Sequence, residues 1–209
     1  MSTNWWEWHD AYARPGSDLS HRLATVSAQI ERRLDATAPD PVRVVSACAG
    51  DGRDLLGVLS RRTDADRVTA LLVENDAGLA ARAREAADAL TATVEVRQAD
   101  AAKSEVYAHA APADLVLLCG IFGNISDADV RATVEAASQL CAPGAEVVWT
   151  RHRHDADLTP SIRSWFADAG FEEVAFVAPE REHWCVGVHK LVAAPRPLEL
   201  GRHWFTFFR

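Results

Sequence analysis

The sequence lacks the features that mark membrane, secreted, metal-binding and nucleic-acid-binding proteins. It has no run of about 18 apolar residues that could cross a membrane, and its first residues lack the basic and apolar regions of a secretory signal. Four cysteines are scattered without a C-x-x-C pair, which argues against a zinc site or a redox pair. Acidic residues outnumber Lys and Arg by 30 to 22, with no basic stripe. We therefore expect a cytoplasmic protein with reduced thiols, without a metal and without a nucleic-acid or membrane partner.

The chain does contain an alternation of buried strands and helical segments. Five apolar runs have the length and composition of buried strands: 42–48, 68–74, 93–98, 113–119 and 145–150. Two later strands, at 171–177 and 183–191, are joined by a link too short for a parallel crossover, so they should pair antiparallel. The sequence predicts an α/β fold with a mostly parallel seven-stranded sheet, helices on both faces and a C-terminal antiparallel hairpin.

Capping residues indicate where the intervening helices begin. Ser17 and Ser126 precede stripes of apolar residues at helical spacing. Asp51 is expected to open a helix directly after the first strand. Thr159 is expected to cap a later helix that has Pro160 at its first position. With no internal repeat or low-complexity linker in its 209 residues, the chain reads as one domain with a short N-terminal addition.

Three successive strand ends carry residues suited to a nucleotide-like ligand. After the first strand, Gly50 and Gly52 allow the backbone to approach a ligand at a helix N-terminus, although an ordinary turn also explains them. Glu74 ends the second strand, where an acid can accept both ribose hydroxyls, and Asp100 follows the third, where a carboxylate can accept an adenine amine. A solvated strand-end carboxylate would also explain Glu74. The three features together indicate a ligand site at the carboxyl edge of the sheet.

With these residues in place, the chain from about 42 to 191 resembles the class I S-adenosylmethionine-dependent methyltransferases of small-molecule type. In the family's first motif, an acid precedes G-x-G-x-G; here Ser46 replaces the acid and Cys48 the first glycine, while the other two glycines match. The acids after the second and third strands match the family's ribose and adenine acids, and 114–125 resembles its fourth motif. The resemblance implies a Rossmann-like fold and S-adenosylmethionine as the cofactor. The cofactor-binding residues it implies are Ser46, Ala47, Cys48, Gly50, Gly52, Asp54, Glu74, Asn75, Asp100, Ala101, Cys119 and Gly120.

Methyl transfer needs little more than alignment of the acceptor with the methyl group, so no fixed catalytic motif is required. A base is needed only where the acceptor is protonated at working pH. The segment TRHRHDAD at 150–157 offers histidines and arginines after the fifth strand, or else forms a solvated basic loop. The candidate bases are His152, His154 and His9. The residues expected to contact the acceptor or form the lid are Trp5, Trp8, Tyr12, Arg14, Phe122, Asn124 and Arg151.

Both ends of the chain are rich in aromatic residues. In many small-molecule members of the family, a segment before the first strand folds across the mouth of the cofactor site. The resemblance therefore implies an N-terminal lid at 1–38, made of the aromatic segment and a helix, ahead of a cofactor-binding core at 39–209. The alternative is that the tryptophans fasten the first helix to the back of the sheet. The tail at 201–209 alternates like a strand and is expected to pack on a sheet edge or on a second subunit of a homodimer.

The sequence thus predicts an S-adenosylmethionine-dependent methyltransferase that methylates oxygen or nitrogen of a small molecule by in-line displacement. One alternative is an enzyme that uses the same cofactor for another reaction, such as transfer of the aminocarboxypropyl group or an internal cyclisation. The altered residues Ser46 and Cys48 motivate it, because they could hold the methionine end of the cofactor differently. Another alternative is a non-catalytic cofactor-binding or scaffold protein of the same fold.

Overall fold

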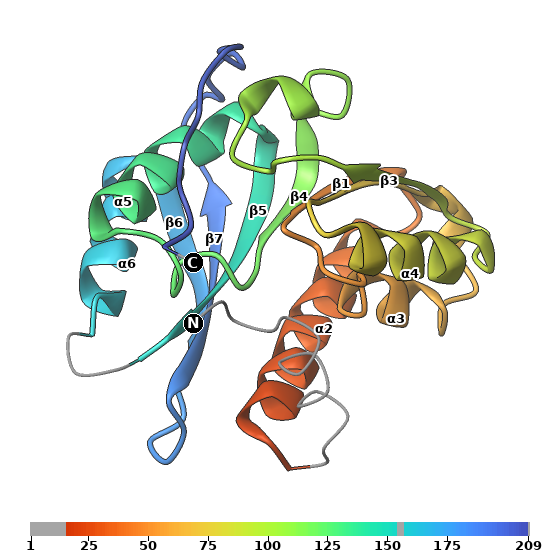
Figure 1. The fold of residues 1–209 in the computed structure, drawn as a ribbon, viewed down its shortest axis with the longest axis horizontal. Helices are drawn as coiled ribbons and strands as arrows, with labels where there is room; N and C mark the ends of the chain where they lie inside the picture. The colour runs from red at the N-terminus through yellow and green to blue at the C-terminus, as the bar shows by residue number, and fades with distance from the viewer. Residues whose placement is uncertain (1–15, 154–156, 209) are drawn as a thin grey trace.

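The computed structural model describes residues 16–153 and 157–208, which fold into three layers around a single sheet (Figure 1). The sheet has seven strands in the order β3-β2-β1-β4-β5-β7-β6. The first five pair in parallel, whereas β7 runs antiparallel to both β5 and β6. Their bounds are β1 (Val42–Ala47), β2 (Val68–Glu74), β3 (Thr93–Gln98), β4 (Ala113–Leu118), β5 (Cys141–His152), β6 (Phe171–Val177) and β7 (Trp184–Leu191). The predicted α/β fold with a closing antiparallel pair is confirmed.

Helices cover both faces of the sheet, because successive strand residues point to opposite sides. Val44 packs in the cluster beneath α2, α3 and α4, while its neighbour Val45 packs in the cluster beneath α5 and α6. The helices are α2 (Asp18–Thr37), α3 (Leu55–Leu59), α4 (Ala77–Asp88), α5 (Asp127–Ala136) and α6 (Thr159–Asp168). Three short 3-10 helices complete the described elements: η2 (Ala65–Arg67), η3 (Ser104–Tyr107) and η4 (Ala137–Gln139).

Two predicted helix starts are wrong, each for a local reason. The helix after β1 begins at Leu55 rather than at Asp51, because Gly52 has a φ of 72° that a right-handed helix cannot contain. Thr159 is the first residue of α6 and not its cap. Its N–H instead donates to the carboxylate of Asp157 at 3.0 Å. Ser17 does cap α2 as predicted, since its hydroxyl accepts from the N–H of Ser20 at 3.1 Å.

Helix α2 belongs to the packed core of the sheet. Its buried face includes Val26, Ile30 and Leu34, which lie in the same cluster as residues of β1 and β7. The helix contacts β7, β5 and α3. The division into a lid at 1–38 and a core at 39–209 stays a prediction, because residues 1–15 lie outside the described residues.

The C-terminal tail does not form the expected strand. Residues 201–208 make two isolated bridges, Lys103 with His203 and Ile125 with Phe207, and pair with neither edge strand of the sheet. In Figure 1 the dark-blue tail descends to the end marked C, beside the loop that follows β4. The segment therefore crosses the loops after β3 and β4 and does not extend the sheet.

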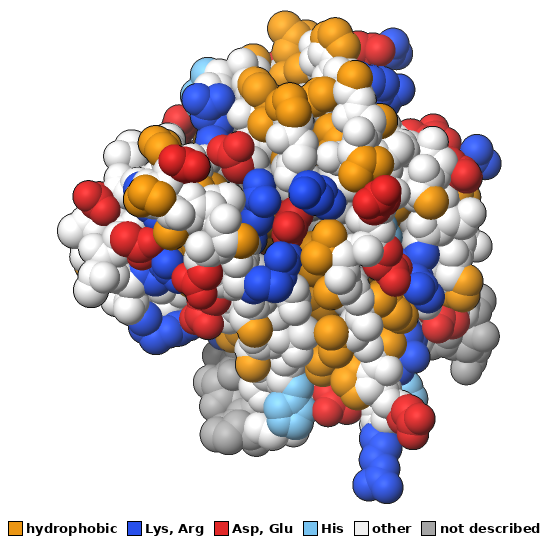
Figure 2. Space-filling model, turned by 180° about the vertical axis from the view of Figure 1, so that it is seen from behind, with side chains coloured by type: hydrophobic (Ala, Val, Ile, Leu, Met, Phe, Trp, Pro, Cys, Tyr) orange, Lys and Arg blue, Asp and Glu red, His pale blue; other side chains and the backbone are white. Residues whose placement is uncertain are grey.

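The surface opposite the view of Figure 1 carries charges of both signs. Figure 2 shows acidic and basic side chains interspersed with apolar ones over this face. None of the helices in the described part of the chain combines enough length and apolar character to cross a membrane.

Candidate functional site

A cavity of about 520 Å³ opens at the carboxyl ends of β1, β2, β3 and β4. Its volume lies in the range of roughly 300–1,000 Å³ typical of small-molecule sites. Parallel strands bring their carboxyl ends to one edge, so residues far apart in sequence meet there. Nine of the predicted cofactor residues line it: Cys48, Gly50, Asp54, Glu74, Asn75, Asp100, Ala101, Cys119 and Gly120.

The loop after β1 turns through left-handed backbone. Gly50 has a φ of 60°, and Cys48, where the resembled family has glycine, has a φ of 54° that side-chain-bearing residues rarely adopt. Burial raises the pKa of the Cys48 thiol well above its usual range, and the charges of Glu74 and Asp100 raise it further. The thiol is therefore a neutral, polarisable part of the cavity wall.

Glu74 holds this loop and also faces the cavity. One carboxylate oxygen accepts from the N–H of Gly50 at 2.7 Å, and the other accepts from the N–H of Asp76 at 2.8 Å. Burial raises its pKa, while these backbone hydrogen bonds act in the opposite direction. The backbone N–H of Asn75 also acts on this carboxylate and lowers its pKa. The carboxylate is thus fixed by the backbone while it lines the cavity.

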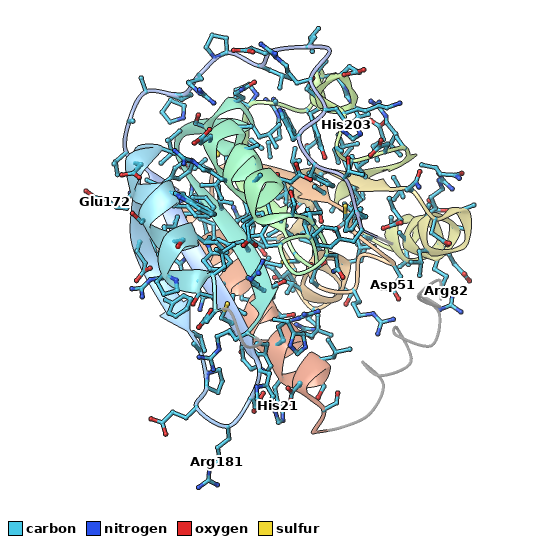
Figure 3. All side chains as sticks on the ribbon, turned by 60° about the vertical axis from the view of Figure 1, so that its left-hand side comes forward. His21, Asp51, Arg82, Glu172, Arg181 and His203 are labelled. Atoms are coloured by element: carbon cyan, nitrogen blue, oxygen red, sulfur yellow. The ribbon has the colours of Figure 1, made fainter. Side chains whose placement is uncertain are left out.

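Asp100 has a similar arrangement at the end of β3. Its Oδ1 accepts from the N–H of Ala102 at 3.0 Å, and its Oδ2 lies 3.2 Å from Nε2 of His203. His203 comes from the C-terminal tail and is labelled in Figure 3. The carboxylate is therefore oriented by its own loop and by the tail.

The part of the cavity beneath α2 is charged. Burial raises the pKa of Asp54 to about 6, with the neighbouring Asp51 raising it further and Arg22 lowering it. The side chain of Asp54 also accepts from the N–H of Leu55 at 2.8 Å and so caps α3. Arg22 is buried, with 6% of its surface exposed, and projects from the first turns of α2. This part of the cavity places a cation beside titratable carboxylates.

Acids outnumber basic residues around the cavity. The charged lining residues are Asp51, Asp54, Glu74, Asp76, Asp100, Arg22 and Arg53. The Arg53 guanidinium is bonded to the Asp51 carboxylate, with Nε 2.8 Å from Oδ1. The excess of carboxylates favours a ligand that carries positive charge.

Three predicted cofactor residues lie behind the cavity wall. Ser46 and Ala47 are buried within β1. Gly52 is needed for packing, because a Cβ there would lie 2.7 Å from side-chain carbons of both Leu56 and Leu72. These three residues shape the wall but are not among the residues that line the cavity.

The predicted acceptor residues in the described chain brace the loop after β4. The side-chain amide of Asn124 donates to the carbonyl of Gly120 at 2.9 Å. Arg151 donates to the carbonyl of Phe122 and lies 3.6 Å from the carboxylate of Asp127. Phe122 itself is buried in the core against Trp149. This loop carries Cys119 and Gly120, so these side chains support the cavity wall from behind.

Of the three candidate bases, only His152 lies within the described residues. His152 ends β5, is half-buried, and does not line the cavity. The remaining candidates lie outside the described residues: His9, His154, Trp5, Trp8, Tyr12 and Arg14. Their roles stay predictions. Within the described residues, no group of three or more His, Cys, Asp or Glu side chains could hold a metal ion, and the four cysteines are free.

Several lining residues were not among the predicted site residues, and two of them, Arg22 and Phe207, come from outside the strand-end loops. Arg22 follows Leu19 and precedes Val26 at helical spacing, so an arginine on the buried stripe of α2 was the available signal. Phe207 reaches the cavity from the C-terminal tail. Nothing in the tail's alternating pattern pointed to the cavity.

Comparison with solved structures identifies the fold. Magnesium protoporphyrin IX methyltransferase from Synechocystis PCC 6803, solved with bound S-adenosylmethionine, superposes with a TM-score of 0.70 at 12% identity, over 91% of this chain and 92% of that chain. An O-methyltransferase family protein from Burkholderia thailandensis gives 0.67 at 18% identity, over 90% and 59% of the two chains. The 1,6-didemethyltoxoflavin-N1-methyltransferase of the same organism, solved with S-adenosylhomocysteine, gives 0.58 at 16% identity, over 82% and 78%. No family model matches the sequence, and no curated protein matches it. The chain thus has the fold of the class I S-adenosylmethionine-dependent methyltransferases.

Proposed function

We propose that the protein binds S-adenosylmethionine in the cavity at the carboxyl edge of the sheet and transfers its methyl group to a small-molecule acceptor. The observation that carries the proposal is the fixed carboxylate of Glu74, which faces the cavity beside the left-handed turn at Gly50. An acid at this strand end is suited to accept hydrogen bonds from the hydroxyls of a ribose. The fold similarity to methyltransferases supports the same assignment.

The other charged residues of the cavity fit the remaining parts of this cofactor. Asp100 can accept a hydrogen bond from the exocyclic amine of the adenine. Arg22, a buried cation that lines the cavity, is suited to the carboxylate of the methionine portion. Asp54 is suited to the amino group, and the acidic lining as a whole favours the sulfonium cation.

When bound, the cofactor supplies an activated methyl group, so the protein's own task is alignment and exclusion of water. Thr150 accepts from the N–H of Gly120 at 2.9 Å and fixes the end of the loop that lines the cavity. We further propose that the N-terminal aromatic segment completes the acceptor side as a lid. A histidine from the predicted set would be required only for an acceptor that must lose a proton.

Calorimetric titration of the purified protein with S-adenosylmethionine and S-adenosylhomocysteine tests the proposal. Both ligands should bind, and Glu74→Gln should weaken both by about 10-fold or more, because hydrogen bonds to a charged group contribute about 1.5–3 kcal/mol. Glu172→Gln, on the edge strand β6 and away from the cavity (Figure 3), is the matched control and should bind as the wild type does. A wild-type protein that binds neither ligand refutes the proposal.

Product analysis separates methyl transfer from its alternatives. Incubation with a panel of small phenols, carboxylic acids and amines should yield S-adenosylhomocysteine and a methylated product. Release of methylthioadenosine would instead indicate transfer of the aminocarboxypropyl group. Tight binding without turnover across the panel would indicate a non-catalytic binding protein.

A further inference from the structure

The C-terminal residues 201–208, which we call the C-terminal strap, are tied in place by main-chain hydrogen bonds. The N–H of Trp204 donates to the carbonyl of Ala102 at 2.9 Å, on the loop after β3. The N–H of Phe208 donates to the carbonyl of Asn124 at 3.0 Å, on the loop after β4. Between them, the N–H of Thr206 donates to a carboxylate that α5 supplies, at 3.1 Å. The strap is therefore anchored at both ends across the edge of the sheet.

The strap's aromatic side chains have different surroundings. Trp204 stacks on the ring of Tyr107 with centroids 5.6 Å apart, and Phe205 is 3% exposed. Phe207 is only half-buried, and its side chain lines the cavity. Phe208 points away, with 66% of its surface exposed. One of these rings thus belongs to the site, while its neighbour does not.

Phe207 forms a backbone bridge with Ile125 on the loop after β4, and its neighbours in the strap contact the loop after β3 that carries Asp100. Its ring lies edge-on to Phe205, with centroids 5.5 Å apart, and Phe205 shares a second, small cavity with Ala101. Ala101 in turn lines the main cavity next to Asp100. His203, four residues before Phe207, reaches the Asp100 carboxylate itself.

We propose that the C-terminal strap is a wall of the cofactor site and that Phe207 packs against the adenosine portion of the bound cofactor. This inference rests on the proposed function, because it assigns a residue to the same cavity. A half-buried aromatic ring in the same cavity as a carboxylate that can accept the adenine amine offers a flat apolar surface to the base. Nucleobases stack on such rings with little dependence on their identity.

Two ligands that share adenosine test the assignment. S-Adenosylhomocysteine carries the amino-acid portion, whereas 5′-methylthioadenosine lacks it. Calorimetry should show that Phe207→Ala weakens both ligands by a similar factor of about 10-fold or more, since base–aromatic stacking contributes about 1–3 kcal/mol. The matched control is Phe208→Ala, which removes an exposed ring of the same strap and should change either affinity by less than about twofold.

Two results overturn the proposal: a Phe207→Ala protein that binds both ligands as tightly as the wild type, or a loss confined to S-adenosylhomocysteine. Thermal unfolding of the free variants shows whether the strap has come loose. If Phe207→Ala does not fold, Phe207→Leu replaces the ring with an aliphatic side chain. It should weaken both ligands several-fold, and unchanged affinities would again overturn the proposal.

Failure of this inference is distinguishable from failure of the proposed function. A wild-type protein that binds neither ligand removes the cofactor assignment and the strap assignment together. A wild-type protein that binds both, alongside a Phe207→Ala protein with unchanged affinities, removes only the strap assignment.

Discussion

The buried imidazole of His189 on β7 should make the stability of the fold depend on pH. The side chain is 1% exposed, and its ring stacks on Phe166 with centroids 4.4 Å apart. Its Nδ1 accepts from the indole N–H of Trp149 at 3.0 Å, which leaves the proton of the neutral ring on Nε2. Burial lowers the pKa of His189 to about 4; Glu173, 3.6 Å away, opposes this shift, and Arg163 adds to it.

The direction of this pH dependence follows from which state, folded or unfolded, binds the proton. An unfolded histidine has a pKa near 6.5, so between pH 6.5 and 4 the unfolded chain takes up a proton that the folded chain does not. Stability is therefore full above about pH 6.5 and falls as the pH drops toward 4. The whole shift corresponds to about 3 kcal/mol, of which about 2 kcal/mol is already lost at pH 5.

Asp54 changes the stability of the fold in the opposite direction over part of the same pH range. Its pKa is raised to about 6, so the folded state binds a proton more tightly than the unfolded state does. Stability from this group is present at low pH and is lost as the pH rises from about 4 to 6. The pH dependence of the wild type alone therefore mixes two opposing contributions, and only a comparison with a variant isolates His189.

Urea unfolding at pH 7.5 and pH 5.0 provides the comparison. His189→Gln keeps an oxygen that can accept from Trp149 but does not titrate. We expect its loss of unfolding free energy between the two pH values to be about 2 kcal/mol smaller than that of the wild type. The control is His109→Gln, which alters an imidazole that is 48% exposed and should follow the wild type. Equal pH dependence in the wild type and His189→Gln would refute the reasoning.

Three further predictions concern the site and its scaffold. Arg22→Leu should weaken the binding of S-adenosylhomocysteine by about 10-fold and leave the binding of 5′-methylthioadenosine unchanged, because only the first ligand carries a carboxylate. Equal losses of affinity for the two ligands in calorimetry would contradict this. At pH 6, binding of S-adenosylmethionine should release about half a proton from Asp54 as the cationic ligand lowers its pKa of about 6. Calorimetry in buffers of different ionisation enthalpy measures that release, and Asp54→Asn should abolish it. Gly187→Ala should lower the free energy of unfolding by about 1–3 kcal/mol, since its Cβ would lie 2.3 Å from the Trp149 ring. In the same urea titration, Gly57→Ala should leave the free energy of unfolding unchanged, because the nearest atom to its Cβ would lie 3.9 Å away.

The strand ends of the site could be predicted because they depend on local pattern and on a general property of parallel sheets. The apolar runs place the ends of β2 and β3 at Glu74 and Gln98, as the structure has them. Parallel pairing then brings the residues after each strand to one edge, whatever the details of packing. That is why Glu74 and Asp100 line the same cavity although 25 intervening residues separate them.

Residues that reach the site from outside the strand–helix units could not be predicted in the same way. Arg22 lines the cavity because α2 packs on β5 and β7, which positions its first turns over the loop after β1. Phe207 arrives through hydrogen bonds between loops that are far apart in sequence. Helical spacing puts Arg22 on the buried face of α2, but its place at the cavity, like that of Phe207, depends on how separate elements dock.

The two glycines of the first loop show where a motif match and a physical role diverge. Gly50 supports the ligand-binding interpretation, because its N–H is held by Glu74 and its backbone lines the cavity. Gly52 matches the motif equally well, yet its missing side chain makes room for Leu56 and Leu72 behind the wall. Cys48 departs from the motif and adopts a left-handed backbone conformation that favours glycine. The conformation of this loop is therefore supported by the hydrogen bond from Gly50 to Glu74 and by the close packing of Gly52 against Leu56 and Leu72, and not by the motif residues alone.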